Sequence, residues 1–448
     1  MNKDGHFLLY RICWAQCSRS FYKPKEIIML NKVVHIIGGG TISHVRTHLA
    51  LAAPAYGGTA RRLAKLCAAH DKTMDVALHL ARMADPTSRV ATNDDLKALV
   101  LELVDNMRTK IVFFNPAVVD FDGQVDVVPS GEQAARLRTK GDDGQPLSYD
   151  LALTPAPKLI SLFRQGGEGR TPRKDIFLVG FKATAGATPE EQYRQGLNML
   201  KASSANLVLA NDVVTRLNMI IVPEEASYSV TADRNEALRA LVEMAYLRSH
   251  LTFTRSTIVA GEPVPWESDL VPTSLRAVVD HCIARGAYKK FRGVTAGHFA
   301  VKIDDTTFLT SRRKTDFNDM KNVGLVKVKT DGPDSVIAYG SRPSVGGQSQ
   351  RIVFTEHPDA DCVVHFHCPK KEGSLVPTVS QKEFECGSHE CGRNTSRGLT
   401  RFDDLLAVYL DRHGPNIVFN RAIDPQKVID FIEENFDLTE KTGGYAIA

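Results

Sequence analysis

The sequence lacks any long hydrophobic run. Its most apolar stretches are the size of single strands, such as residues 111–114, and fall far short of the about 20 residues that a transmembrane helix needs. It also lacks a strong excess of charge of one sign, since 56 Lys and Arg stand against 52 Asp and Glu. Residues 1–30 alone hold five basic and two acidic side chains, so the rest is nearly neutral. These absences argue against a membrane partner and against dedicated nucleic-acid binding.

Cysteine is sparse and unevenly spaced. The 8 cysteines in 448 residues form no regular framework of the kind found in small disulfide-rich domains, which favours a reducing cytoplasm. Low-complexity segments and internal repeats are also missing, and hydrophobic residues make up 43% of the chain. The composition therefore predicts a folded cytoplasmic protein, and the length favours two domains.

The first half alternates strand-like and helix-like segments after an N-terminal extension, residues 1–31. An apolar run at 33–37 leads into a glycine-rich turn, and a second such turn opens a helical run at 60–69. Further strands are predicted at 110–114, 176–180, 207–210 and 219–222, with helices at 189–203 and 234–249. This alternation predicts an α/β fold, a Rossmann-like doubly wound domain over residues 32–262.

The pattern of predicted strands and helices changes after a proline-containing break at residues 261–272. A predicted helix at 273–285 leads into short strands that alternate apolar and polar residues, followed by an apolar strand at 362–367 and a closing helix at 424–434. We therefore predict an α+β domain over residues 263–448.

Two histidines, His365 and His367, end the apolar strand at 362–367. Residues two apart in a strand point to the same face, so both imidazoles can reach one ion. Zinc or another borderline divalent metal would take a third ligand and keep a fourth position open for catalysis. The alternative interpretation is a pair of partly buried structural histidines.

Several motifs around this pair of histidines follow one another along the chain. Pro343-Ser344, the stretch from His357 to His367, and His413-Gly414 resemble the class II aldolase/adducin family over about residues 272–440. The resemblance implies that His365, His367 and His413 bind a divalent ion, usually zinc, which polarises a carbonyl group while a carbon–carbon bond breaks or forms. It also implies homo-oligomers, commonly tetramers with sites between subunits.

The chain departs from this family where its catalytic glutamate should stand. That position holds Gly346, and a glycine cannot move a proton. Glu385 or Glu390 is predicted to supply the base if the fold brings either near the ion. The phosphate-binding turns differ too: residues 297–300 read Gly-His-Phe-Ala. Residues 312–314, Arg-Arg-Lys, are predicted either to bind an anion or to form a solvated loop.

The first half carries a second set of motifs. Gly39-Gly40-Thr41, Val179 to Thr184 and Ala210 to Val213 resemble the synthetase domain of the DNA/pantothenate metabolism flavoproteins, which includes phosphopantothenate–cysteine ligase, over about residues 32–260. The resemblance implies a dimeric ligase that binds CTP, or another nucleotide, with Mg²⁺. The residues that it places around the nucleotide are Gly39, Gly40, Phe181, Ala183, Asn211 and Asp212.

Further residues are candidates for binding the nucleotide's phosphates. Gly57 and Gly58 precede a helix, where backbone N–H groups can meet an anion. Arg136 stands in a segment that replaces a lysine-rich motif of the ligases. The ligases' Asn and Lys before that helix are missing here, which favours a nucleotide-binding or assembly role over full ligase activity.

The leading prediction is thus a two-domain metabolic protein with zinc-dependent aldolase or lyase chemistry on a small phosphorylated or carboxylated substrate, and with a nucleotide-binding first domain. One alternative is a nucleotide-dependent phosphopantothenate–cysteine ligase-like enzyme that uses the second domain as a scaffold. The other is a non-catalytic binding or assembly protein. In each case we expect a homo-oligomer, either a dimer or a tetramer.

Overall fold

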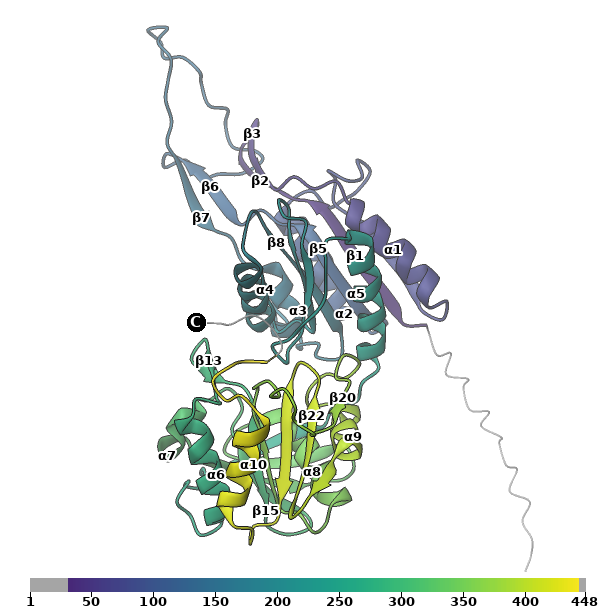
Figure 1. Cartoon of the computed structure of the whole chain (residues 1–448). Helices are drawn as coiled ribbons and strands as arrows, with labels where there is room; N and C mark the ends of the chain where they lie inside the picture. The colour runs from purple at the N-terminus through teal and green to yellow at the C-terminus, as the bar shows by residue number, and fades with distance from the viewer. Residues whose placement is uncertain (1–30, 443–448) are drawn as a thin grey trace, which may run out of the picture.

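The computed structural model describes residues 31–442, so the predicted extension lies outside this range except for its last residue. Two large β-sheets, each with helices packed against it, lie one above the other in Figure 1. The prediction of an α/β protein is confirmed. Within residues 31–442, no helix combines the length and the apolar character that crossing a bilayer requires.

The first sheet has seven strands in the order β11-β10-β9-β8-β5-β1-β4. The five strands from β9 to β4 run parallel, β10 pairs antiparallel with β9, and β11 pairs antiparallel with β10. The strands are β1 (Val33–Gly40), β4 (Asp75–Leu80), β5 (Thr109–Ala117), β8 (Phe177–Thr184), β9 (Leu207–Asp212), β10 (Asn218–Ile221) and β11 (Ser227–Thr231).

Helices cover both faces of this sheet, so its central strands are mostly apolar. One face carries α1 (Gly58–His70) and α5 (Arg234–Ser249), and the other carries α2 (Asn93–Asp105), α3 (Leu162–Gln165) and α4 (Pro189–Ser203). Side-chain caps in the sequence define where two of these helices begin. Thr92 and Asp95 form a reciprocal capping box at α2, and the Asp233 carboxylate caps α5.

Two hairpins extend beyond the carboxyl ends of the parallel strands (Figure 1). They are β2 (Ile42–Arg46) with β3 (Leu49–Ala52), and β6 (Phe121–Val125) with β7 (Leu151–Pro155). The connection between β6 and β7, residues 126–150, forms the long arm at the top of Figure 1. Strand–helix alternation alone did not predict either hairpin.

The second sheet has ten strands, nine of them in the order β12-β18-β17-β16-β15-β19-β23-β22-β20, with β21 paired to β22. Its strands are β12 (Arg255–Val259), β15 (His298–Lys302), β16 (Thr307–Ser311), β17 (Leu325–Thr330), β18 (Ser335–Tyr339), β19 (Cys362–His365), β20 (Thr378–Val379), β21 (Thr400–Phe402), β22 (Leu405–Leu410) and β23 (Gly414–Phe419). The chain therefore enters this sheet at Arg255, before the boundary predicted at residue 262, which stays a prediction.

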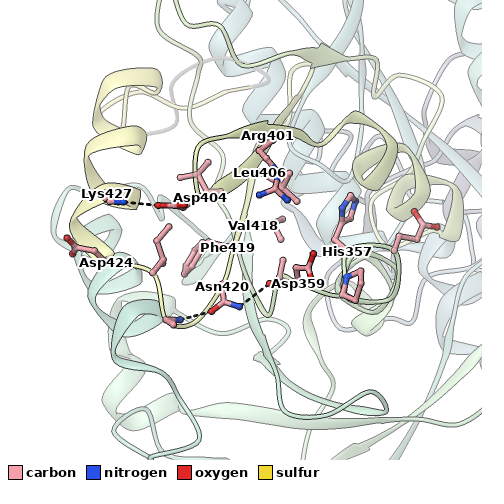
Figure 2. Close-up of a pocket in the computed structure, with 16 residues that line it drawn as sticks. His357, Asp359, Arg401, Asp404, Leu406, Val418, Phe419, Asn420, Asp424 and Lys427 are labelled. Carbon is pink, nitrogen blue, oxygen red and sulfur yellow. Dashed lines mark hydrogen bonds and ion pairs between the residues drawn. The ribbon is translucent and has the colours of Figure 1, made fainter.

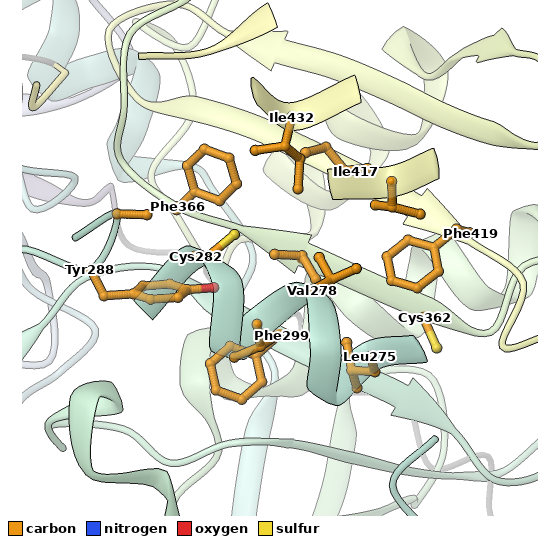
Figure 3. Packing of buried hydrophobic residues seen from close by; sticks show 14 of the residues in the cluster. Leu275, Val278, Cys282, Tyr288, Phe299, Cys362, Phe366, Ile417, Phe419 and Ile432 are labelled. Atoms are coloured by element: carbon orange, nitrogen blue, oxygen red, sulfur yellow. The ribbon is translucent and has the colours of Figure 1, made fainter. Parts of the chain in front are cut away.

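Helices lie on both faces of the second sheet as well. The core shown in Figure 3 packs α6 (Thr273–Ala284) and α10 (Pro425–Asn435) against one face. The other face packs against α8 (Gln348–Glu356), with α9 (His389–Gly398) beside it. The alternation along β19 sets these faces, since Val364 joins the first core and Val363 the second.

The remaining short elements connect these layers. They are β13 (Lys290–Phe291), β14 (Val294–Thr295), α7 (Met320–Val323), and the 3₁₀ turns η1 (Leu159–Ser161), η2 (Phe317–Asp319) and η3 (Ser344–Gly347).

Candidate functional site

Three histidines converge at the end of the second sheet that faces the first domain. His365 ends β19, His367 follows two residues later, and His413 lies in the turn between β22 and β23. One ring nitrogen of each lies within 4.8 Å of the others, and all three side chains are buried. The structure thus brings together the three residues that the sequence predicted as metal ligands. It does so although β19 ends at His365, so His367 reaches the cluster from beyond the strand.

Two glycines allow this convergence. Gly414, next to His413, has φ = 142°, and a Cβ atom there would stand 2.1 Å from the Phe366 carbonyl oxygen. Gly297 has φ = 111°, and a Cβ atom there would stand 2.6 Å from the His365 carbonyl oxygen. Any larger residue would push the neighbouring backbone away. The glycines therefore let the flanking chains approach the histidine segment closely.

The protonation state of the cluster suits a metal ion. Burial lowers the pKa of His365 to about 4 and lowers the pKa values of His367 and His413 well below their usual range, so all three rings are neutral at pH 7. The Nδ1–H of His365 donates a hydrogen bond to the Pro415 carbonyl oxygen at 2.6 Å, which places the ring's lone pair on Nε2, the atom that faces His413. The Nδ1 atoms of His367 and His413 are buried and have no hydrogen-bond partner among residues 31–442.

The spacing of the rings also fits zinc. The Nε2 atoms of His365 and His413 lie 3.3 Å apart. Two nitrogens held about 2.0–2.1 Å from one ion at the tetrahedral angle are about 3.3–3.4 Å apart. The His365–His413 pair therefore has a spacing that suits one divalent ion, and His367, with a ring nitrogen within 4.8 Å of the other two, could supply the third ligand.

A fourth buried histidine lies beside the cluster. His298 pairs in register with His365 on the neighbouring strand, and the two ring centroids are 4.9 Å apart. Its Nδ1 atom is also buried, with no hydrogen-bond partner in the part of the chain that the structure describes. The sequence offered only an indirect signal for it, because His298 stands in the altered turn at residues 297–300.

The two carboxylates predicted as the base are engaged with other groups. The Glu385 carboxylate accepts a hydrogen bond from the Asn206 side-chain amide of the first domain at 3.1 Å. Both oxygens of Glu390 accept hydrogen bonds from Thr252. Gly346, at the position of the family's carboxylate, lies in η3. The catalytic roles of Glu385 and Glu390 stay predictions.

The Glu385 carboxyl should make stability depend on pH. Burial, reinforced by the nearby Glu224, raises its pKa from 4.5 to about 7, so folding favours the protonated form. This contribution to stability is complete below about pH 4.5 and is lost as the pH rises through 7. We expect Glu385→Gln to remove this loss of stability. Melting temperatures of the wild type and of Glu385→Gln, measured between pH 5 and 8, would show it. Parallel pH profiles for the two proteins would contradict the assignment.

Apart from Arg136, the residues predicted to bind a nucleotide gather at the end of the first sheet that lies away from the second domain. They lie at the carboxyl ends of β1, β8 and β9 and at the start of α1. Ala183 and Asn211 are register partners on adjacent strands. The second domain instead contacts the end of this sheet where the parallel strands begin, through residues such as Asn206 and Glu224.

Two of these predicted residues have other surroundings. The Asp212 carboxylate accepts hydrogen bonds from four backbone N–H groups, foremost that of Thr215, and from the Thr184 hydroxyl. These bonds hold its pKa well below the usual range and fix the loops after β8 and β9. Arg136 is exposed on the long β6–β7 connection. Their part in nucleotide binding stays a prediction.

A polar pocket of about 550 Å³ opens at the far end of the second sheet, where β19 begins and β23 ends (Figure 2). Its wall includes the ion pair between Lys427 and Asp404, at 2.7 Å, and His357. No motif in the sequence predicted this pocket. Within residues 31–442, the only group of His, Cys, Asp and Glu side chains placed to share a metal ion is the histidine cluster.

Comparisons with known proteins identify parts of the chain. Residues 279–372 match the class II aldolase and adducin N-terminal domain family. No curated protein matches the sequence at a significant level. Among solved structures, the DNA/pantothenate metabolism flavoprotein from Streptococcus pneumoniae aligns over 48% of this chain and 97% of its own, with 18% identity and a TM-score of 0.36.

Two further structures are similar over part of the chain. The C-terminal domain of the coenzyme A biosynthesis bifunctional protein CoaBC aligns over 48% of this chain and 95% of its own, with 14% identity and a TM-score of 0.34. The L-fuculose-1-phosphate aldolase from Thermus thermophilus aligns over 38% of this chain and 89% of its own, with 19% identity and a TM-score of 0.27. The sequence thus carries a match to the class II aldolase and adducin N-terminal domain at residues 279–372, and it is similar over about half its length to structures of the pantothenate flavoprotein type, as its two sets of motifs predicted.

Proposed function

We propose that this chain is a two-domain cytoplasmic enzyme whose class II aldolase-like α+β domain binds zinc, or another divalent ion, through His365, His367 and His413. The reaction is a lyase or aldol reaction on a small phosphorylated or carboxylated substrate. A Rossmann-like first domain binds a nucleotide, and the chains assemble into homo-oligomers. The observation that carries the proposal is the convergence of three buried, neutral imidazoles with nitrogens within 4.8 Å of one another.

The chain's own residues prepare the site for this chemistry. His365, His367 and His413 would hold the divalent ion, which would supply a Lewis acid for a substrate carbonyl group. The Pro415 carbonyl fixes the orientation and tautomer of His365. Burial of the rings excludes water, which strengthens electrostatic interactions inside the site.

Cationic side chains next to η3 can hold the anionic group of the substrate. The backbone N–H of Arg313 donates to the Arg342 carbonyl oxygen at 2.9 Å, so the backbones of these two exposed arginines are neighbours. Lys174 of the first domain lies close enough that Arg342, and then Arg313, help lower its pKa. Arg312 is already engaged with Ser341 and with a backbone carbonyl. Guanidinium groups bind phosphate and carboxylate through two parallel hydrogen bonds, which supports Arg313 and Arg342 as the anion site.

The proposed activity is tested on protein purified without chelator. We expect about one zinc ion per chain by elemental analysis, and aldehyde release from at least one member of a panel of phosphorylated ketoses and hydroxy acids. Chelation should abolish this release, and added zinc should restore it. Protein without bound metal, whose melting temperature does not respond to zinc, would refute the proposal, because a ligand at 100 times its Kd adds about 2.7 kcal/mol of stability.

A further inference from the structure

The last described segment of the chain, residues 437–442, ends beside the histidine cluster. The Thr442 N–H donates to the His367 carbonyl oxygen at 3.1 Å, and its hydroxyl donates to the His413 carbonyl oxygen at 2.8 Å. Earlier in the segment, the Leu438 carbonyl oxygen accepts a hydrogen bond from the Lys289 ammonium at 3.0 Å. The segment thus binds two of the three predicted ligands through their backbone.

The first domain holds this segment by a buried ion pair. The Lys441 ammonium contacts the Glu225 carboxylate, and each of these side chains is 5% exposed. Glu225 also pairs with Lys201, at 3.1 Å. Burial raises the pKa of the Glu225 carboxyl, but the two ammonium groups outweigh this effect and keep the pKa below its ordinary value. The carboxylate is therefore charged, and Lys441 has a fixed partner in the first domain.

The same edge of the first domain supports the turn that carries His413. The Arg412 guanidinium donates to the Ser227 carbonyl oxygen at 3.0 Å and lies over the Tyr228 ring, 5.8 Å from its centroid. The Tyr228 hydroxyl donates to the Asp411 carbonyl oxygen at 3.4 Å. The first domain thus contacts both residues 437–442 and the β22–β23 turn, two segments that adjoin His413.

We propose that Glu225 is a positioning residue for the histidine site: through Lys441 it fastens residues 437–442 over the cluster, so the first domain controls how fast a metal ion and its ligands enter and leave. The inference rests on the proposed metal binding. The buried rings become accessible when this segment lifts, and lifting it requires separating Lys441 from Glu225. The equilibrium preference of the three imidazoles for metal does not depend on this contact.

The test measures zinc transfer from the full-length, zinc-loaded protein to a coloured chelator. We expect Glu225→Gln and Lys441→Met each to speed zinc release at least about 10-fold, with the stoichiometry still one ion per chain. The double variant should release zinc no faster than the faster single variant, because both changes undo one contact. Lys427→Met, which breaks a Lys–Asp pair at the far end of the same sheet, is the matched control.

The outcomes separate this inference from the proposed function. Wild-type protein that binds no zinc overturns the proposed metal site itself. Wild-type protein that binds zinc and releases it at the same rate as both variants overturns only the fastening role. Lys441→Met decides the matter if Glu225→Gln fails to fold, since it leaves the ion pair between Glu225 and Lys201 in place. A lower zinc stoichiometry in these variants would also contradict the proposal.

Discussion

Replacing His413 by alanine is expected to lower zinc affinity by more than about 100-fold and to leave protein that loses its metal on dialysis. The reason is the donor count, because two buried imidazoles cannot complete a site built from three. Changing only a hydrogen-bond partner of a ligand already costs about 10–100-fold in metal proteins. The measurement is zinc content after dialysis, together with the visible spectrum of the cobalt-substituted protein.

His357→Gln is the control for this experiment. His357 lines the pocket at the other end of the same sheet and hydrogen-bonds Ser396. Its replacement should leave zinc content and the cobalt spectrum unchanged. If His413→Ala keeps stoichiometric zinc with wild-type affinity, the cluster is not the metal site. Zinc should also raise the melting temperature of the wild type and of His357→Gln but not that of His413→Ala.

Replacing Arg248 by methionine should lower the free energy of unfolding by about 3–5 kcal/mol, since it breaks a buried ion pair. The Arg248 guanidinium lies 3.1 Å from the Glu224 carboxylate, and these side chains are 0% and 1% exposed. Arg248 also donates to the carbonyl oxygens of Lys382 and Gln381 in the second domain, at 3.0 and 3.3 Å. The variant therefore leaves a buried charge unpaired at the contact between the domains. Urea denaturation would measure the loss.

A double variant separates the ion pair from simple packing. Arg248→Met combined with Glu224→Leu removes both charges, so the unpaired carboxylate of the single variant is gone and part of the stability should return. It also removes the acceptor of the Cys386 N–H, which lies 2.6 Å from Glu224, so recovery should stay incomplete. A single variant that loses less than about 1 kcal/mol would show that the pair is dispensable.

The sequence allowed the order of elements and the grouping of the three histidines to be predicted because both have motif-level signals. Apolar runs such as 33–37 became buried central strands, and the helix expected at 273–285 is α6. The histidines of the two motifs lie together because the motifs stand at the same end of neighbouring strands, β19 and β23, and their metal binding stays a prediction. Periodicity and motif order therefore sufficed for these parts.

Contacts between distant segments have no such local signal. The pairing of β12 with β18 and the fastening of Lys441 by Glu225 join residues separated by about 80 and by 216 positions. Glu385 illustrates the consequence for the site. Its position in the sequence is compatible with a base near the metal, but the fold engages its carboxylate with Asn206, 179 residues away.

The parallel strands of the first sheet place its carboxyl edge on the side away from the second domain. The eight residues of β1 span about 26 Å at about 3.3 Å per residue. A compound released beside the glycine turns would thus have to diffuse around the whole domain through bulk water before it met the histidines. The covalent joining of the two halves fixes their ratio and their shared location, and any intermediate common to both would mix with the surrounding pool instead of being channelled.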